Sequence, residues 1–359
     1  MSSTITRARA ERRTILNNAH EQSHLFYMNP QGDGDGPNRA KLLYASQKSI
    51  FCPNLRVRTR TKRFTNASTS CFNLGCDCFR RNRIVVGISV DGPEDIHDAH
   101  RRFRNGRGSH ALAMRGIEAL QRNRVPFHCI SVITADAMEQ PERMYRFFRD
   151  HVINDVSFNV EEKEGINTSS SMAGSNMEAK YKDFLRTFWR LSEQDGYPVV
   201  LREFEQVISL IQDDQRMTQN ELNRPFSILS VDAQGDFSTF DPELLSVASD
   251  RYGTFNLGNL KTHSLEESTR TDSFQRLLQD MTQGVETCQK GCEHFGLCGG
   301  GNGSNKFWEH GTLASSETNA CRFGTKIPVE VLLERFEEGP PLEVNRTTIA
   351  PQSSYYLIT

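Results

Sequence analysis

The stretch Ile84-Val-Val-Gly-Ile-Ser-Val-Asp-Gly-Pro93 decides the fold class of this chain. Its run from Ile84 to Val90 is almost entirely apolar and has the length of a strand. Because apolar and polar residues do not alternate in it, the run is typical of a strand covered on both faces. We therefore expect a buried strand that ends at Asp91.

Helical and strand-like patterns alternate downstream of this strand. Ser109 can cap a helix that runs to about Asn123, with Ala113, Ile117 and Leu120 on one face. The next segments are predicted to be a strand, a helix and a strand over 127–134, 141–151 and 155–160. This order predicts an α/β fold in which crossover helices join parallel strands.

Polar groups follow three of these strands. They are Asp91-Gly92-Pro93, Thr134 with Asp136, and Glu161-Glu162-Lys163. In folds with parallel strands the chemistry gathers at the C-terminal strand ends. We expect these groups to converge where a ligand would lie.

The pattern changes in the second half of the chain. Helices are expected over 175–194 and 202–212, with Phe184, Phe188 and Trp189 in the core. A β-hairpin is predicted where 226–231 and 237–240 flank Gln234-Gly235-Asp236, and a short helix over about 328–336. The chain then divides into a basic, irregular segment at 1–60, an α/β region at 61–225, a cysteine-rich domain at 226–325, and a helix with a polar tail at 326–359.

Composition places the chain among ordinary soluble proteins. Its 359 residues are 36% hydrophobic, enough for a sizeable core. No stretch approaches the ~20 apolar residues of a membrane span, and the N-terminus lacks the apolar part of a secretory signal, so the expected compartment is the cytoplasm. Residues 1–83 hold 15 Lys and Arg against 5 Asp and Glu. We interpret this excess as a solvated arm and expect no nucleic acid, because no recognition motif accompanies the charge.

Four cysteines form the most specific pattern in the sequence. Cys288, Cys292 and Cys298 have the spacing Cys-x3-Cys-x5-Cys, and Cys321 follows. Four thiolates complete either a [4Fe–4S] cluster or a tetrahedral zinc site, and unligated buried cysteines are the third interpretation. Gly296 and Gly299-Gly300-Gly301 surround Cys298 and allow the backbone to approach a bulky ligand closely. Amide donors near the sulfurs would tune a cluster, which favours iron–sulfur.

Weaker patterns are set aside. Residues 299–306 resemble a phosphate-binding loop, but no Gly-Lys-Ser/Thr follows. We expect His97, Asp98 and His100 to start a helix or to pair with neighbouring arginines, although a metal site is conceivable. Cys129 lies in an apolar strand and is interpreted as core.

Two motifs resemble a known family. The run Ile88-Ser-Val-Asp-Gly-Pro93, with Ile96-His-Asp98 and Arg101, resembles the radical S-adenosylmethionine (radical SAM) enzymes of the sulfatase-maturase type. The run from Cys288 to Arg322, with Cys298-Gly-Gly-Gly-Asn-Gly-Ser-Asn-Lys306 and Glu317-Thr318, resembles their cysteine-rich SPASM extension. Phe158-Asn-Val-Glu-Glu162 and Ser169-Ser-Ser171 are further similar to the cyclophane-forming peptide maturases.

The resemblance covers roughly residues 64–325 and implies a partial (β/α)6 barrel with a SPASM-like C-terminal domain. It implies S-adenosylmethionine as a cofactor and a 5′-deoxyadenosyl radical that abstracts hydrogen from a ribosomally made precursor peptide. A reductant protein such as a flavodoxin or ferredoxin is the implied redox partner.

Site residues follow from the same resemblance, position by position. Ser89 and Asp91 match strand-end positions near S-adenosylmethionine, and Thr65-Asn66 matches a pair that ends an earlier strand. Asp241 matches a carboxylate that accepts a proton, although turn formation before Pro242 is the simpler interpretation. The four cysteines match the ligands of an auxiliary cluster: Cys288, Cys292, Cys298 and Cys321.

The sequence departs from the family in two places. Phe240 stands where many SPASM domains have a cysteine, so we expect one auxiliary cluster only. The Cys-x3-Cys-x2-Cys loop of the catalytic cluster is absent from the 359 residues, and Cys71, Cys76 and Cys78 have a different spacing.

These departures lead to two hypotheses. We expect a barrel that is incomplete at its N-terminus, with residues 1–60 not forming its first strands. The first hypothesis is a radical SAM/SPASM peptide maturase. The second is a non-catalytic iron–sulfur or zinc protein that binds peptide.

Overall fold

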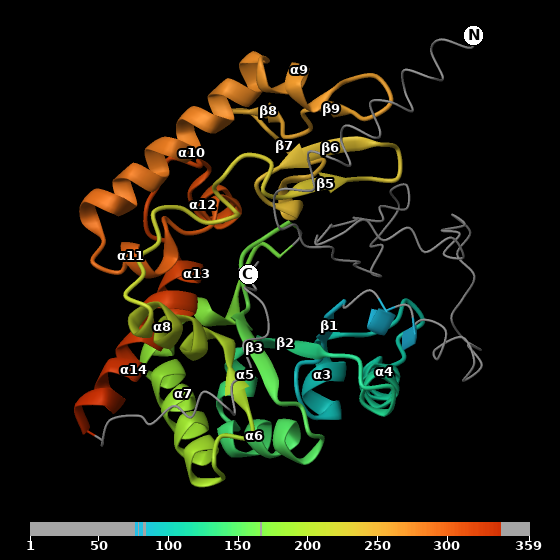
Figure 1. Ribbon diagram of the computed structural model, residues 1–359, viewed down its shortest axis with the longest axis vertical. Helices are drawn as coiled ribbons and strands as arrows, with labels where there is room; N and C mark the ends of the chain where they lie inside the picture. Colours follow the sequence, from blue (N-terminus) through green and yellow to red (C-terminus); the bar gives the residue numbers. More distant parts are fainter. Residues whose placement is uncertain (1–75, 78, 82–83, 166, 339–359) are drawn as a thin grey trace.

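The structure is a computed structural model that describes residues 76, 77, 79–81, 84–165 and 167–338 (Figure 1). Three predictions lie outside these residues: the absence of barrel strands from 1–60, the Thr65-Asn66 pair, and the positions of Cys71 and Cys78. No helix in the described part of the chain is long and apolar enough to cross a membrane.

The first half of the described chain is built on a parallel sheet. Its four strands follow the order β1-β2-β3-β4, and every adjacent pair is parallel. The predicted alternation of strands and helices is therefore confirmed. The elements are β1 (Val86–Ser89), α3 (Glu94–His100), α4 (His110–Arg122), β2 (Phe127–Ile133), α5 (Ala135–Met138), α6 (Pro141–Asp150), β3 (Asp155–Val160), η2 (Ser171–Ala173), α7 (Met177–Gln194), β4 (Val200–Leu201) and α8 (Arg202–Gln212).

The two faces of this sheet differ in chemistry. On the outer face Cys129, Val156 and Phe158 pack into one apolar cluster with Phe184 and Phe188 of α7. On the inner face the register aligns Ser89 with Ile130, and Ile130 with Ser157. Side chains alternate between the faces of a strand, so one face of each strand builds the core and the other carries polar groups.

The free edge of β3 is closed by a side chain. Because β4 ends after two residues, the backbone N–H of Phe158 donates to Oε2 of Glu203 at 3.3 Å. Ser157 Oγ donates to the other oxygen of the same carboxylate at 2.9 Å. Glu203 thus replaces a strand partner at this edge.

The second half contains small antiparallel sheets and a long helix. β5 pairs with β6 in the predicted hairpin, and β6 pairs with β9. The 20-residue helix α10, which the sequence analysis did not predict, packs Phe274, Leu277 and Met281 into a second apolar cluster. The elements are β5 (Leu229–Val231), β6 (Asp236–Thr239), η3 (Pro242–Leu244), β7 (Ala248–Ser249), β8 (Gly253–Thr254), β9 (Gly258–Asn259), α9 (Leu265–Thr269), α10 (Asp272–Gly291), α11 (Phe295–Cys298), α12 (Gly303–His310), α13 (Asn319–Cys321), η4 (Arg322–Lys326) and α14 (Ile327–Glu338).

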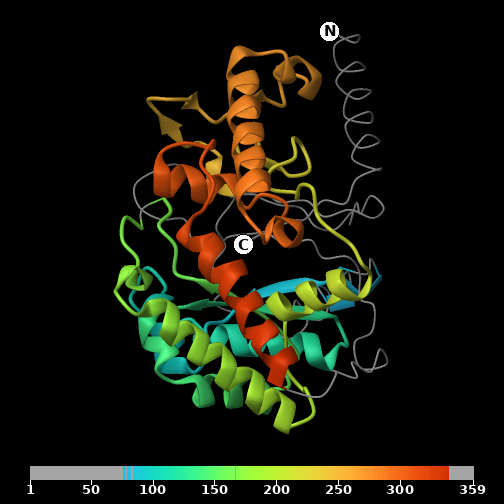
Figure 2. The same ribbon diagram turned by 90° about the vertical axis from the view of Figure 1, so that its left-hand side faces the viewer.

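The last helix returns to the first half of the chain. α14 packs against α7 and α8, and Figures 1 and 2 show it descending from the cysteine region along the helices that cover the sheet. Phe323, Ile327 and Leu332 are buried in the same cluster as the outer sheet face. The outer core is therefore completed by residues that follow Cys321.

Two local predictions were wrong. β1 spans only Val86–Ser89, and Gly87 on its inner face is exposed, so burial on both faces is not found along this strand. Ser109 precedes α4 but its side chain does not cap the helix. Oδ1 of Asp98 does so instead, accepting from the N–H groups of Ser109 and His110 at 2.8 and 2.9 Å. This approach requires Gly108, since a Cβ there would lie 1.7 Å from the Asp98 carboxylate.

Candidate cluster site and strand-end face

Three helices, α10, α11 and α13, carry the four predicted cysteines. Cys288 lies in the last turn of α10, and Cys292 is its C-cap residue. Cys298 ends α11, and Cys321 ends α13, where its N–H donates to the Thr318 hydroxyl at 3.0 Å. All four are free thiols, and Cys288 is the most buried, at 8% exposed.

A glycine turn wraps around Cys298. Gly299, Gly300 and Gly301 all have positive φ, and the N–H groups of Gly300 and Gly301 donate to the Cys298 thiol. Asn220 Nδ2 donates to the carbonyls of Cys298 and Gly301 at 2.8 and 3.1 Å, and Asn223 Nδ2 donates to that of Gly299 at 2.7 Å. The segment before the hairpin therefore fixes the turn from outside.

The thiols interact with one another and with a buried lysine. Burial raises the pKa of Cys298, and the neighbouring thiols Cys292 and Cys288 raise it further, while the glycine N–H groups oppose this. Burial also raises the pKa of Cys321 to about 12, with Cys298 adding to it. Lys306 of α12 is 1% exposed, and its Nζ donates to Cys288 Sγ at 3.6 Å.

This donor set suits a group that supplies positive charge. As neutral thiols the four cysteines would leave the Lys306 ammonium without a charged partner, whereas ligated thiolates would pair with it. Amide donors at Cys298 are the type of contact that tunes an iron–sulfur cluster. Among the described residues, no three His, Cys, Asp or Glu side chains are close enough to hold a single metal ion. The ligand role of the cysteines stays a prediction.

The first turn of α12 also contacts the loop after β3. Ser304 Oγ donates to Glu164 at 3.0 Å, and Asn305 Nδ2 donates to Glu162 at 2.6 Å. Burial raises the pKa of Glu162 to about 7, against the hydrogen bond from Asn305, and the Asp241 carboxylate raises it further. Burial also raises the pKa of Glu164, and the carboxylates of Asp241, Glu243 and Glu162 raise it further.

Asp241 lies beside this acidic loop. It is 1% exposed, lies two residues after the end of β6 and caps the short helix η3, with Oδ1 accepting from the Glu243 N–H at 2.7 Å. The turn-forming role is therefore present in the structure. Phe240, which precedes it, is fully buried with φ of 71°. A role of Asp241 as a proton acceptor stays a prediction.

Asp91 forms an internal clamp at the end of β1. Its Oδ2 accepts from Arg101 Nε at 2.6 Å, and its Oδ1 accepts from the Val132 N–H at 2.9 Å. Its own N–H donates to Nδ1 of His97, so Nε2 of His97 carries the proton and donates to Ser109 Oγ at 3.0 Å. Burial lowers the pKa of His97 to about 4, which keeps the ring neutral. Any contribution of Asp91 to ligand binding is consequently one of positioning.

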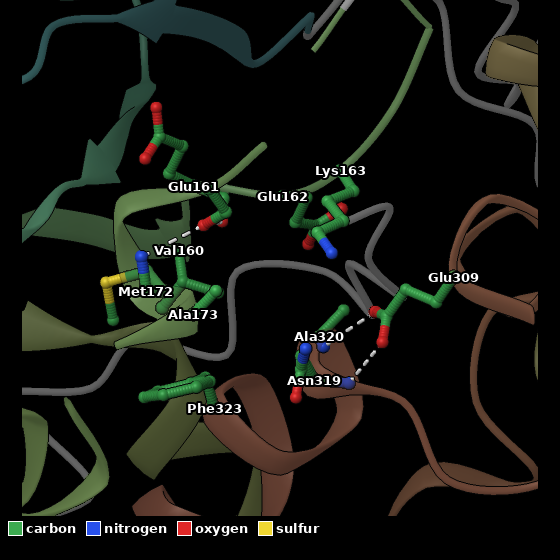
Figure 3. A pocket seen from close by; sticks show the side chains of 11 residues that line it. Val160, Glu161, Glu162, Lys163, Met172, Ala173, Glu309, Asn319, Ala320 and Phe323 are labelled. Atoms are coloured by element: carbon green, nitrogen blue, oxygen red, sulfur yellow. Dashed lines mark hydrogen bonds between the residues drawn. The ribbon is translucent and has the colours of Figure 1, made fainter. Parts of the chain in front are cut away.

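The strand-end groups surround two separate hollows. Thr134 and Asp136 line a cleft of about 380 Å³, together with Asp95 and His100 of α3. Glu161, Glu162 and Lys163 line a cavity of about 20 Å³, enough for one water molecule, beneath the C-terminal helices. Figure 3 shows this cavity, with Glu309 accepting from the N–H groups of Asn319 and Ala320 on its far side. The predicted convergence of strand-end groups is therefore divided between two places.

Ser89 is half-buried at the end of β1.

Two other cysteines are structural. Cys76 is 3% exposed, packs with Leu120 and Val125, and its thiol points to the Ala119 carbonyl at 3.8 Å. Cys129 is fully buried in the outer core, as predicted. Neither lies with the four C-terminal thiols.

The buried turn Ser304-Asn305-Lys306 was not predicted from the sequence, in which these residues form only part of the motif that follows Cys298. The available signal was a polar triplet between a glycine turn and the aromatic pair Phe307-Trp308, in a segment that forms an amphipathic helix.

Comparisons with curated proteins identify relatives. No protein-family model matches the chain. An uncharacterized protein of Synechocystis sp. is 49% identical over 264 residues, which are 74% of this chain and 66% of that protein. The cysteine-type anaerobic sulfatase-maturating enzyme of Clostridium perfringens is 24% identical over 229 residues, 61% of this chain and 58% of the enzyme. The chain thus spans about two thirds or less of the length of these relatives.

Solved structures have the same fold. The structure of native anSMEcpe with bound AdoMet and Cp18Cys peptide matches with a TM-score of 0.58 and 20% identity, covering 76% of this chain and 72% of that one. A histidine-tagged form of anSMEcpe with bound AdoMet matches with a TM-score of 0.57 at the same identity, covering 76% and 68%. The resemblance to radical SAM peptide maturases of the sulfatase-maturating type is therefore confirmed, and the mixed α/β fold is similar to theirs.

Proposed function

We propose that this chain is a radical SAM peptide-modifying protein whose C-terminal cysteines hold one [4Fe–4S] cluster. Its parallel sheet is then part of a (β/α)6 barrel, and the region after it is SPASM-like. The observation that carries the proposal is buried Lys306, which contacts Cys288 and lies near Cys298 and Cys321, on a helix that also contacts the loop at the C-terminal end of β3.

Each part of the chain has a role in this proposal. Cys288, Cys292, Cys298 and Cys321 would hold the cluster, which supplies a one-electron acceptor. The chain's own residues hold the geometry: the Asp91 clamp fixes the end of β1 beside Ser89, where S-adenosylmethionine would bind.

The substrate would be a peptide, as in the anSMEcpe complex with AdoMet and Cp18Cys peptide. In this proposal the carboxylates of Asp241 and Glu162 act as proton acceptors, at the place where the loop after β3 contacts the second half of the chain. A flavodoxin- or ferredoxin-type protein would supply electrons.

A specific observation favours a second candidate, a peptide-binding relative that keeps the C-terminal cluster but does not cleave S-adenosylmethionine. Cys76 is directed into the core, so it is not available for a three-cysteine cluster at the strand ends. In this candidate the protein binds the cofactor and the peptide without radical chemistry.

Two measurements on anaerobically reconstituted protein test the proposal. Iron and sulfide analysis should give about four of each per chain. Cys321→Ala should abolish this iron, whereas Cys76→Ala, which removes a buried thiol remote from the site, should retain it. Zinc-loaded, iron-free protein would contradict the cluster assignment.

Formation of 5′-deoxyadenosine from S-adenosylmethionine under reducing conditions then separates the two candidates. The Cys-x3-Cys-x2-Cys loop is absent, so we expect no product from this chain alone, and that result would favour the second candidate. Turnover that depends on Cys71, Cys76 or Cys78 would overturn this expectation and assign the catalytic cluster to those residues.

A further inference from the structure

Lys306 is the most unusual charged residue in the described chain. It is 1% exposed, and among the residues of known position no carboxylate forms an ion pair with it. Its contact is the sulfur of Cys288, and the other groups that act on its charge are Cys298 and Cys321. An ammonium buried without a charged partner costs several kcal/mol or more, so this placement requires a compensating negative charge.

The surroundings of Lys306 leave room for its head group and for little else. In α10, a Cβ on Gly284 would lie 3.1 Å from Lys306 Nζ and 2.3 Å from the Leu313 carbonyl oxygen. On the other side, a Cβ on Gly301 would lie 3.9 Å from Lys306 Cε. The ammonium is thus held between the helix that carries Cys288 and the turn that follows Cys298.

We propose that Lys306 is a positioning residue that raises the reduction potential of the C-terminal cluster. The inference rests on the proposed function, because it takes the four cysteines as cluster ligands. A one-electron reduction adds one negative charge to the cluster, and a fixed positive charge beside a ligand sulfur stabilises the reduced form more than the oxidised form. Burial keeps this effect large, since water and salt screen the interaction poorly.

The proposal separates a charge effect from a packing effect. In the metal-free protein no bound cluster compensates the buried Lys306 charge, so removing this charge should leave the free energy of unfolding unchanged or increased. In the loaded protein the same removal should lower the midpoint potential. A residue with only a packing role would reduce the stability of both forms and leave the potential in place.

The test compares three variants by potentiometric titration followed by electron paramagnetic resonance, and by urea unfolding of the metal-free proteins. Lys306→Met removes the charge and the donor, and Lys306→Gln removes the charge but keeps a donor. Lys290→Met is the matched control, because Lys290 lies in the same helix as Cys288 but its side chain is 77% exposed. We expect both Lys306 variants to lower the midpoint potential relative to the wild type and to Lys290→Met.

Each outcome decides the matter. Equal midpoint potentials in loaded Lys306→Met and Lys290→Met overturn the inference. If neither Lys306 variant takes up iron, urea unfolding of the metal-free proteins decides. Variants as stable as the wild type support a role of the charge toward the cluster, and destabilised variants overturn it. A wild-type protein that binds zinc refutes the proposed function as well, whereas four iron with unchanged potentials refutes the inference alone.

Discussion

Replacing Gly299 with alanine should lower the free energy of unfolding of the metal-free protein more than the same change at Gly301 or Gly291. Gly299 has φ of 64°, and a Cβ there would lie 2.6 Å from the backbone carbonyl carbon of Gln219. A left-handed conformation costs a non-glycine residue about 1–2 kcal/mol, and overpacking against an immobile backbone adds about 1–3 kcal/mol. We therefore expect the free energy of unfolding to fall by about 2–5 kcal/mol.

Two further glycines provide a graded comparison. Gly301 has φ of 72°, but a Cβ there would meet only the Lys306 stem at 3.9 Å, so Gly301→Ala should cost about 1–2 kcal/mol from the backbone alone. Gly291 ends α10 with nothing within 4 Å of the added atom, and Gly291→Ala should be neutral or stabilising by up to about 1 kcal/mol.

Urea unfolding of the metal-free proteins, followed by circular dichroism, measures this series without interference from the metal. Equal midpoints for Gly299→Ala and Gly291→Ala would refute the reasoning. So would a loss at Gly301 as large as the loss at Gly299, because a Cβ at Gly301 would meet no other backbone segment within 4 Å.

Three further perturbations follow from the structure. Asp91→Ala should lower the free energy of unfolding by about 2–4 kcal/mol, because it leaves the Arg101 guanidinium and the Val132 N–H without their acceptor. The same change should weaken S-adenosylmethionine binding, measured by equilibrium dialysis. Unchanged affinity in a folded variant would limit Asp91 to a structural role. Asp98→Ala should cost about 1–2 kcal/mol in thermal unfolding, since two N–H groups at the start of α4 lose their cap; no change would show that water replaces it. The pKa of Glu162 is raised to about 7, so between about pH 4.5 and 7 the native state binds more protons than the unfolded state. The free energy of unfolding should therefore fall as pH rises through this range, by at most ~1.4 kcal/mol per pH unit. Denaturation of Glu162→Gln should show a smaller fall of this free energy with pH, and an equal fall in both proteins would contradict the shifted pKa.

The parts of the fold that were predictable are those with local signals. The apolar runs at 127–134 and 155–160 correspond to β2 and β3 because a strand buried on its outer face needs little else to be recognised. The long helix α10 was also within reach: Thr271 caps it, and Phe274, Leu277, Met281 and Cys288 recur at helical spacing. Its many polar residues concealed that pattern.

Contacts between distant segments could not be read from the sequence. Asp98 replaces Ser109 as the cap of α4 only because Gly108 lets its carboxylate approach, a matter of chain geometry. Likewise, Glu162 and Glu164 were recognised as a polar strand end, but their partners lie about 140 residues later and show no periodic signal. Spacing identifies a set of cysteines, yet it carries no information about the lysine that lies between them.

The turn Ser304-Asn305-Lys306 joins the two candidate sites through the geometry of a helix. Successive residues of an α-helix are rotated by about 100°, so three neighbours in one turn point in three directions. Two of them reach the acidic loop after β3, and the third reaches the sulfur of Cys288. All three are buried, so none can move without disturbing the others. Under the proposed function, a charge change at the cysteines acts on the same rigid turn that holds Glu162 and Glu164, and loading the proposed cluster should fix the positions of these two carboxylates.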